Sequence, residues 1–554
     1  MLIAPHFGGR RNLHTPRAAT RESSQQGHLT TSIAEGSNAA PARRLLGAAA
    51  VIGLGNVLSR GLGLVRDAVI AATFGATTGT DAFLIARTLS TIVYDLLVGS
   101  VSSAAFVPVF VQHAQNERQL WRLVGAIFSL AALAFVVLAA VLAVLADQVI
   151  AIVGQGFSSE EQRALAANLM RIALLAVILQ GLAGVLTSVL YARNRFSLPA
   201  FATATYNAGI IVGIALLAQT TGVLALALGL VIGAFAQLAL QAAGLQEFWR
   251  AYRPRIDLAD PDVRRILALA GTVAAGYLVT IASQVLDRTL ASQLLVGSIT
   301  LMEFATRIIQ VPLGVIGLAV SFAILPTLAR FSSGSDASVD SYRESLLFGL
   351  KLVLLLMLPI FTIAAALAQP LVAVLFERGA FHSEETARTT AIFLAYSPQL
   401  PLTAVDLLLI NAFYARQNAR TPVLVGVVCV GIYLVVALST IGPLAAVGLA
   451  LANAVQNSSH AVILLVLLRR SLPGLRLGSA LLPFLLRTLP AAALAGALAF
   501  VLLPWLAPLG NLLALLIGGT AAGAVYIALL YVLGVPEARQ ALALAWARSP
   551  LREP

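Results

Sequence analysis

Two arginines lie inside the first long apolar segment of the chain. Arg60 and Arg66 fall within the run SRGLGLVRD at residues 59–67. A charge near the centre of a bilayer costs roughly 3 kcal/mol on insertion scales, so such a residue faces a protein interior or a water-filled path. A guanidinium group donates two charge-assisted hydrogen bonds to phosphate oxygens. The pattern therefore predicts a protein-lined cavity that binds an anion, and a diphosphate is a suitable ligand.

Later apolar segments carry further ionisable residues. Arg87 lies in the second segment and Arg307 in the eighth, and we expect both to face the same cavity as the first two arginines. Asp287 and Asp406 are the carboxylates available for binding a coupling cation.

Each of these residues also has a structural interpretation. Arg66 can pair with Asp67 or Asp95, because buried ions are usually paired. Glu303 and Arg307 have the i, i+4 spacing of an ion pair within one helix. The two aspartates considered for cation binding can likewise be purely structural. These alternatives stay open at the level of the sequence.

Motifs for covalent chemistry are missing from the sequence. No glycine-rich loop ends in Gly-Lys-Ser or Gly-Lys-Thr, so ATP hydrolysis is not indicated. The histidines do not cluster with carboxylates, and His460 is isolated in its segment. The single cysteine, Cys429, excludes an intramolecular disulfide. We therefore expect no cofactor, no metal and no enzymatic activity in the covalent sense.

The composition describes the elements that hold these residues. Hydrophobic residues make up 59% of the 554 and charged residues 11%, with a mean hydropathy of +0.90, whereas soluble domains carry roughly 25% charged residues. The formal charge of +12 is spread between apolar segments, which argues against nucleic acid as a partner. The sequence predicts an all-α polytopic membrane protein. Fourteen stretches are long enough to cross a bilayer of about 30 Å: 45–73, 81–110, 121–147, 165–190, 199–218, 222–245, 266–291, 298–328, 346–369, 387–413, 421–440, 444–468, 481–503 and 511–533.

Basic residues mark one side of the membrane. One set of alternate loops holds most of the arginines, whereas the opposite set holds three, Arg163, Arg378 and Arg388. Because basic loops stay in the cytoplasm, both termini are expected there. Residues 1–42 are predicted to be a disordered extension. Residues 536–554 are expected to form an amphipathic tail on the inner leaflet or, alternatively, a solvated end.

The chain contains an internal repeat. YARNRFSLP at 191–199 recurs as YARQNARTP at 414–422, and Arg87 matches Arg307 at nearly the same spacing. Six helices per copy give both copies the same orientation, related by an axis along the membrane normal. We expect two six-helix lobes around a central cavity and an appended helix pair. The expected segments are the extension 1–42, the N-terminal lobe 43–250, the C-terminal lobe 251–470, the last two helices 471–535 and the tail 536–554.

Several motifs resemble one known family. They are SRGLGLVRDAVIAATFGATTGTDAF at 59–83, AFVPVF at 105–110, NRFSLPAF at 194–201, PLGVIGLAVSFAILPTLA at 312–329 and FYARQNARTPV at 413–423. Together they resemble the MviN/MurJ lipid II flippases of the multidrug/oligosaccharidyl-lipid/polysaccharide exporter superfamily. The resemblance implies fourteen helices in a bacterial plasma membrane and transfer of undecaprenyl-diphosphate-linked peptidoglycan precursor to the outer leaflet by alternating access. It implies as partners the lipid-linked diphosphate, membrane lipid and, less directly, the cell-wall synthesis machinery.

The resemblance also implies roles for individual residues. The family's cavity arginines match Arg60, Arg66 and Arg307. The family's aspartate after the Phe-Gly-Ala turn matches Asp81, which the resemblance adds to the substrate-binding residues.

The chain departs from the family pattern in its second helix. The family's Arg-Arg pair is replaced by Tyr-Asp at 94–95. Arg87 lies seven residues earlier on the same helical face and is expected to stand in for the lost cation, or else to neutralise Asp81 or Asp95. The family's sodium-binding carboxylate has no counterpart in 421–440. Two other functions therefore stay open: export of another polyprenyl-linked glycan or an amphipathic drug, and a membrane scaffold without transport.

Overall fold

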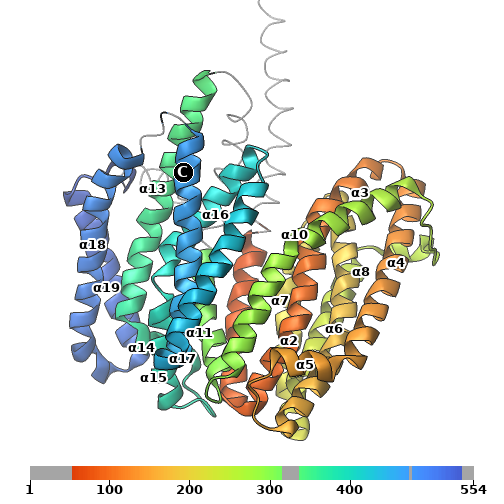
Figure 1. The fold of residues 1–554 in the computed structure, drawn as a ribbon, viewed down its shortest axis with the longest axis horizontal. Helices are drawn as coiled ribbons and strands as arrows, with labels where there is room; N and C mark the ends of the chain where they lie inside the picture. Colours follow the sequence, from red (N-terminus) through yellow and green to blue (C-terminus); the bar gives the residue numbers. More distant parts are fainter. Residues whose placement is uncertain (1–50, 52, 315–335, 473, 475–476, 539–554) are drawn as a thin grey trace, which may run out of the picture. The chain divides into compact units, whose positions relative to one another are not determined.

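A computed structural model describes residues 51, 53–314, 336–472, 474 and 477–538. The predicted extension 1–42 and residues 539–554 of the predicted tail lie outside these ranges. The chain divides into two compact units, Met1–Leu54 and Gly55–Pro554, and all elements discussed below belong to the second. Every regular element of the described residues is a helix, which confirms the all-α class (Figure 1).

The first half of the repeat is packed around its longest helix, α6, which contacts α2, α4 and α8. Polar side chains begin several of these helices: Thr77, Asn116 and Ser159 each accept a backbone N–H from the residue three positions later. The elements are a helix that includes residues 55–74, α2 Thr78–Tyr94, the π-helix η1 Asp95–Phe106, α3 Val107–His113, α4 Glu117–Val144, α5 Ala146–Val153, α6 Glu160–Ala192, α7 Ser197–Thr221, α8 Leu224–Ala243 and α9 Gln246–Ala251.

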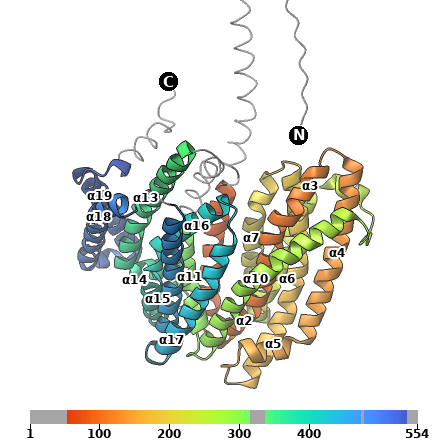
Figure 2. The same ribbon diagram turned by 45° about the horizontal axis from the view of Figure 1, so that its top comes forward.

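The second half and the C-terminal helices pack through α13, which contacts α16 and α18, and through α18, which contacts α19 (Figure 2). The elements are α10 Pro261–Ser292, α11 Ser298–Pro312, α13 Asp336–Ala366, α14 Ala368–Phe376, α15 Ser383–Tyr396, α16 Gln399–Ala415, α17 Arg420–Ser471, α18 Leu477–Leu506, the short 3₁₀-helix η3 Ala507–Leu509 and α19 Asn511–Val532. Helix α17 consists of two halves joined at a kink at Ala445.

The repeat is visible in the backbone conformation. Asn194 and Gln417 both adopt a φ of 57°, although neither is glycine. Gly222 has φ 57° and ψ −134°, and Ala445 has φ 47° and ψ −125°. The members of each pair are separated by the same stretch of sequence as the two copies of the YAR motif. Positive φ is uncommon outside glycine, so its recurrence at matching positions confirms the internal repeat predicted from the sequence.

The predicted number of fourteen spans is not confirmed. Among the described residues, eight helices are long and apolar enough to cross a membrane, and ten if each of two bent helix pairs counts as one span. The kinked helix α17 counts once, although it contains the two predicted spans 421–440 and 444–468. The predicted eighth span, 298–328, runs into residues outside the described ranges.

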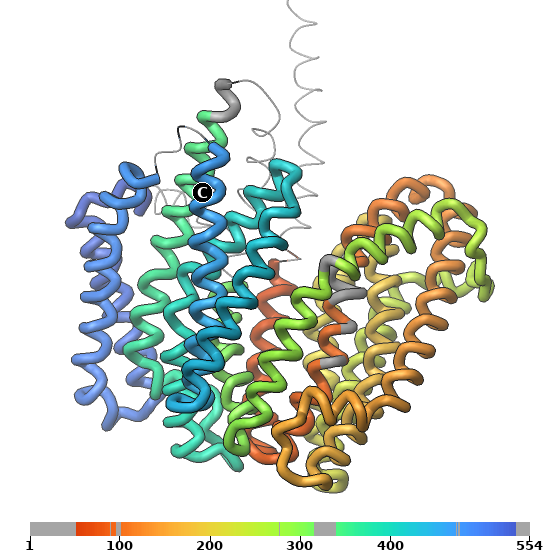
Figure 3. The backbone as a smooth tube through the Cα atoms, in the orientation of Figure 1, coloured from red at the N-terminus to blue at the C-terminus, as the bar shows by residue number. Residues whose placement is uncertain are grey.

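Helix α10 connects the two halves. It packs against η1, α4 and α5 of the first half, and against α11 and α17 of the second (Figure 3). Polar residues in the last turns of α10 are therefore held next to the second helix of each half.

The two halves are closed against each other at the loops that are poor in arginine. The backbone N–H of Ala380 donates to the carbonyl of Ala72 at 2.8 Å. A Cβ atom on Gly75 would lie 2.5 Å from the Ala380 oxygen, and one on Gly379 would lie 2.2 Å from the Ala72 oxygen. Both glycines have positive φ. No larger residue fits either position, so these glycines permit close backbone contact between the halves.

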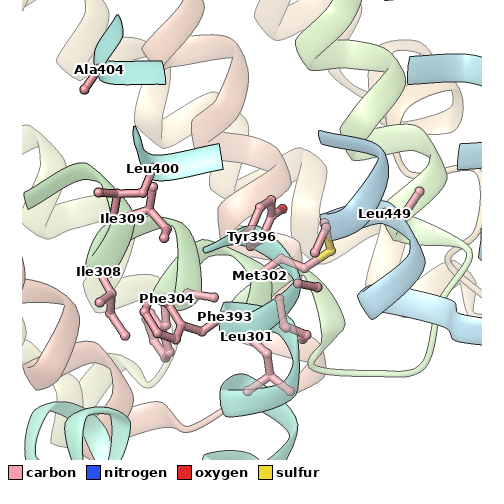
Figure 4. Close-up of a cluster of buried hydrophobic side chains, with 14 of the residues drawn as sticks. Leu301, Met302, Phe304, Ile308, Ile309, Phe393, Tyr396, Leu400, Ala404 and Leu449 are labelled. Carbon is pink, nitrogen blue, oxygen red and sulfur yellow. The ribbon is translucent and has the colours of Figure 1, made fainter. Parts of the chain in front are cut away.

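A cluster of buried apolar side chains fixes the orientation of α11. Phe304 stacks on Phe376 with ring centroids 4.7 Å apart, and it packs with Phe393 in the cluster that Figure 4 shows. Ile308 and Ile309 extend the same apolar surface. In a membrane, moving an apolar side chain from lipid into a protein interface gains little hydrophobic free energy. Close packing therefore holds such helices together. The polar residues of α11 are consequently directed away from this cluster.

Candidate functional site

The four arginines predicted to line a cavity converge. Arg60, Arg66, Arg87 and Arg307 all line a cavity of about 230 Å³ between the first helix, α2, α7 and α11. Arg60 donates from Nη1 to the backbone carbonyl of Gln310 at 2.8 Å. The first helix is continuous through its glycines, so both of its arginines are presented from one rigid element.

Arg66 is held by polar groups of its own half. It is 7% exposed, its Nε donates to Oδ1 of Asp67 at 2.9 Å, and its Nη1 donates to Oδ1 of Asn207 at 2.9 Å. The pair that the sequence offered as a structural alternative is therefore present. It does not remove Arg66 from the cavity, because Arg66 is still one of the lining residues.

Glu303 is the centre of a larger cluster. Its Oε1 accepts from Nη2 of Arg87 at 2.5 Å and from Nη2 of Arg307 at 2.8 Å. Its Oε2 accepts from Nη2 of Arg288 at 2.6 Å. One buried carboxylate thus holds arginines from α2, α10 and α11, and the expected pair within α11 is one contact of three.

Arg307 joins this cluster to the first helix. Its Nε lies 3.2 Å from Oδ2 of Asp67, an ion pair without an aligned hydrogen bond, and its Nη1 donates to Oε1 of Gln310 at 2.9 Å. Asp67 and Glu303 are both nearly fully buried. The arginines are therefore connected in one network that spans both halves of the repeat.

A second cavity of about 640 Å³ adjoins the first. Arg87, Thr91, Asp95, Arg307 and Gln310 line both cavities. The second cavity continues between α10, α15 and α17. Space for a polar ligand therefore extends on either side of Arg87 and Arg307, the two arginines that match in the repeat.

The lining carries only a small excess of positive charge. Among the described residues, no carboxylate lies within ion-pair distance of Arg60, whose partner is a neutral carbonyl. Removing one partner from a buried charge pair costs several kcal/mol, so buried cations need an anion nearby. The lining and its paired groups contain five arginines and four carboxylates: Arg60, Arg66, Arg87, Arg288 and Arg307, with Asp67, Asp95, Asp287 and Glu303.

Asp81 lies apart from this site. Its Oδ2 accepts from the N–H of Gly297 at 2.6 Å, and its Oδ1 accepts from the N–H and the hydroxyl of Thr300 at 2.9 and 2.6 Å. Gly297 is the N-cap residue of α11 and Thr300 lies in its first turn, where the N–H groups have no partner within the helix. Asp81 lines neither cavity. The structure therefore gives it a capping position across the two halves.

The two aspartates considered for cation binding lie in the second half. Asp287 lines the larger cavity and accepts a hydrogen bond from the Tyr433 hydroxyl at 2.8 Å. Asp406 lies 2.7 Å from the imidazole of His460. The described residues contain no group of three or more His, Cys, Asp or Glu side chains that could hold a metal ion. Cation coupling at either aspartate stays a prediction.

Sequence analysis missed Arg288 and the pairing of His460. Arg288 lies in the predicted seventh span, so the criterion that selected Arg60, a charge inside an apolar segment, would have found it. The partner of His460 is 54 residues away on another helix, and no spacing rule indicates that contact.

The fold is that of a polytopic transporter. A structure described as "Lipid II flippase MurJ, inward closed conformation" matches with a TM-score of 0.73 at 21% identity, covering 87% of this chain and 98% of that one. An inward-facing MATE family multidrug transporter matches with a TM-score of 0.58 at 14% identity, covering 77% and 95%.

Sequence comparison identifies the family within this class. The family model for lipid II flippase MurJ matches residues 70–518. The probable lipid II flippase MurJ of Haemophilus influenzae is 30% identical over 74% of this chain and 83% of its own length. That of Bdellovibrio bacteriovorus is 28% identical over 89% of this chain and 96% of its own length. The chain belongs to the lipid II flippase MurJ family.

Proposed function

We propose that this chain is a bacterial inner-membrane flippase that moves lipid II, the undecaprenyl-diphosphate-linked peptidoglycan precursor, from the inner to the outer leaflet. The observation that carries the proposal is the convergence of arginines from both halves on one cavity. Paired donors of this kind suit the oxygens of a diphosphate. Transport of this kind moves a lipid without changing its covalent bonds.

The carboxylate of Glu303 indicates how the site holds its charge without a substrate. It binds three arginines that would otherwise repel one another. A diphosphate in the smaller cavity would lie among Arg60, Arg66, Arg87 and Arg307, and it would compete with Glu303 for the last two. Substrate binding would therefore loosen the Arg87 contact that joins α2 to α11, and would leave the Arg288 contact from α10 in place.

Alternating access follows from the arrangement of the halves. With the arginine-rich loops and both termini in the cytoplasm, the closed loops around Gly75 and Gly379 lie on the outer side. The lobes proposed from the sequence, 43–250 and 251–470, would then rock about the arginine network. Because the cytoplasm is negative, outward movement of an anionic head group is favourable by about 2.3 kcal/mol per charge per 100 mV.

Growth of a bacterium depleted of its own lipid II flippase tests this function. Expression of this chain should restore growth, and membrane vesicles should show labelled lipid II reaching the outer leaflet. A variant with Arg171→Ala should restore growth as well as the unchanged chain does, because Arg171 lies on α6 outside the cavity, where it pairs with Asp147 at 2.7 Å. Normal membrane abundance without rescue would refute lipid II as the substrate and favour another lipid-linked glycan or a scaffold role.

A further inference from the structure

A histidine in the second half of α17 contacts polar atoms of two other segments. Nδ1 of His460 lies 2.7 Å from Oδ1 of Asp406 on α16, and Nε2 lies 3.1 Å from the backbone oxygen of Pro422 in the first half of α17. The side chains of His460 and Asp406 are only 16% and 14% exposed. The imidazole therefore joins three helical segments within the C-terminal half.

Both partners of this imidazole are hydrogen-bond acceptors. The carbonyl of Pro422 has no hydrogen to donate, and neither has an ionised carboxylate. A neutral imidazole carries one N–H, so it can satisfy one contact and must turn a lone pair toward the other oxygen. Both contacts become hydrogen bonds only when the pair holds one further proton, as imidazolium with carboxylate or as imidazole with carboxylic acid.

We propose that His460 and Asp406 form a proton-binding site that clamps α16 to both halves of α17. With the proton bound, the pair is neutral overall and every close contact is a hydrogen bond. Without it, the pair carries a buried negative charge and a lone pair faces the Pro422 oxygen at 3.1 Å. The C-terminal half is tightest when the site is protonated. This inference goes beyond lipid transport and does not depend on it.

Other titratable side chains surround the His460–Asp406 pair, and their contacts are as follows. Among the described residues, Cys429, a buried thiol on the first half of α17, is a further titratable side chain that interacts electrostatically with Asp406. Several titratable groups on the surrounding helices have other partners: Asp287 of α10 with the Tyr433 hydroxyl, Tyr396 of α15 beside Asp287, Tyr342 of α13 with the carbonyl of Ala412, Lys351 of α13 with Glu537, and Arg416 with Ser471.

The first half of the repeat lacks this pair. In the register of the YAR repeat, Pro422 corresponds to Pro199, whereas His460 corresponds to Gln237 and Asp406 to Ala183. The backbone carbonyl is thus kept and both ionisable groups are specific to the second half. A glutamine can donate without titrating, so the first half has no equivalent proton requirement.

The substitution Asp406→Asn tests the proposal because it supplies the hydrogen permanently. The asparagine amide can donate to Nδ1 of a neutral His460, whose Nε2–H is then free to donate to Pro422. The experiment measures the Tm of the full-length protein in detergent micelles between about pH 6 and pH 9. A histidine in an unfolded chain releases its proton near pH 6.5, whereas the folded site retains it. Stability from the clamp is therefore present at low pH and lost as the pH rises.

The wild-type Tm should fall by about 2–5 °C more than that of Asp406→Asn over this range. The control is His113→Gln, which removes a second histidine–carboxylate contact of the described residues, 2.9 Å between His113 Nε2 and Asp262 Oδ2, and should leave that difference unchanged. If Asp406→Asn does not fold, ¹⁵N spectra of the histidine rings, assigned with His460→Gln, replace it. Equal pH dependence in wild type and Asp406→Asn, or a His460 ring that titrates near pH 6.5 like a free histidine, overturns the proposal.

Discussion

The N-terminal and C-terminal halves of the repeat bend at equivalent places but carry different polar groups. Asn194 and Gln417 turn the chain with the same positive φ, and Gly222 and Ala445 do so again. In the first half, the buried charged residues Arg66, Asp67, Asp81 and Arg87 all lie on its first two helices. In the second half, the charged residues of the cavities and the imidazole pair are spread over four helices: Asp287 and Arg288 on α10, Glu303 and Arg307 on α11, Asp406 on α16 and His460 on α17.

One matched pair of residues shows how the halves diverged. Asp67 and Asp287 correspond in the same register as Arg87 and Arg307. Asp67 is buried between Arg66 and Arg307, whereas Asp287 faces the larger cavity and accepts a hydrogen bond from Tyr433. The repeated backbone places both carboxylates toward the centre. Their neighbours decide whether each one neutralises a cation or stays open to a ligand.

The strongest test of this comparison is Arg307→Ala. This variant should lose transport by about 30-fold or more, because a charged donor to the anion is removed from a buried network. Membrane abundance should stay near normal, since Glu303 keeps Arg87 and Arg288 and Asp67 keeps Arg66. Lipid II flipping and immunoblots of membranes measure the two quantities. Lost protein with normal activity per molecule would instead assign Arg307 to the ion pair within α11.

Arg87 is the equivalent residue of the first half, and its removal should also stop transport. Adding Tyr94→Arg to Arg87→Ala should restore flipping in part, because the new cation lies on the same face of the second helix, about 10.5 Å further along it. Both 87 and 94 line the smaller cavity. Flipping assays on the single and double variants measure this. A silent Arg87→Ala variant would show that the halves contribute unequally and would weaken lipid II as the substrate.

Labelling of a cysteine introduced at Gly63 tests whether the first half of the repeat moves during transport. A Cβ atom there lies 3.5 Å from the Asn207 amide, so Gly63→Cys fits without displacing its neighbours. In a protein whose native Cys429 has been replaced, the new thiol should be labelled from each side of the membrane in different states. Substrate should shift the ratio of the two labelling rates. Labelling from one side under all conditions would support a static scaffold.

The smallest effects are expected where the halves share a backbone bend. Ala445→Gly should stabilise the protein by about 1 kcal/mol, because glycine adopts φ 47° and ψ −125° without a clash of Cβ with the backbone. Gly222→Ala should destabilise it by about 1–2 kcal/mol for the same reason. Thermal unfolding of the two variants measures both. Effects of equal sign would show that the bends are not equivalent.

The fold class and most of the arginine site could be predicted because charges inside apolar segments are conspicuous in a sequence. Arg288 satisfies the same criterion, because it lies inside the predicted span 266–291. The partners of these arginines were harder to predict from the sequence. Spacing indicates the Glu303–Arg307 contact within one helix, but not the contact of Arg87 with Glu303, which is 216 residues away. The family resemblance placed Asp81 among the substrate-binding residues, whereas in the structure it lines neither cavity and binds the start of α11.

That position of Asp81 has a consequence for the rate of transport. Three hydrogen bonds join it to the first turn of α11, at the end where the halves are closed. Opening this end must break all three before water can enter and replace them. The cost therefore falls on the barrier between the closed and open states more than on either state. In the proposed transport cycle, Asp81 would set how long this end stays closed, whereas the arginines would set the affinity for the lipid.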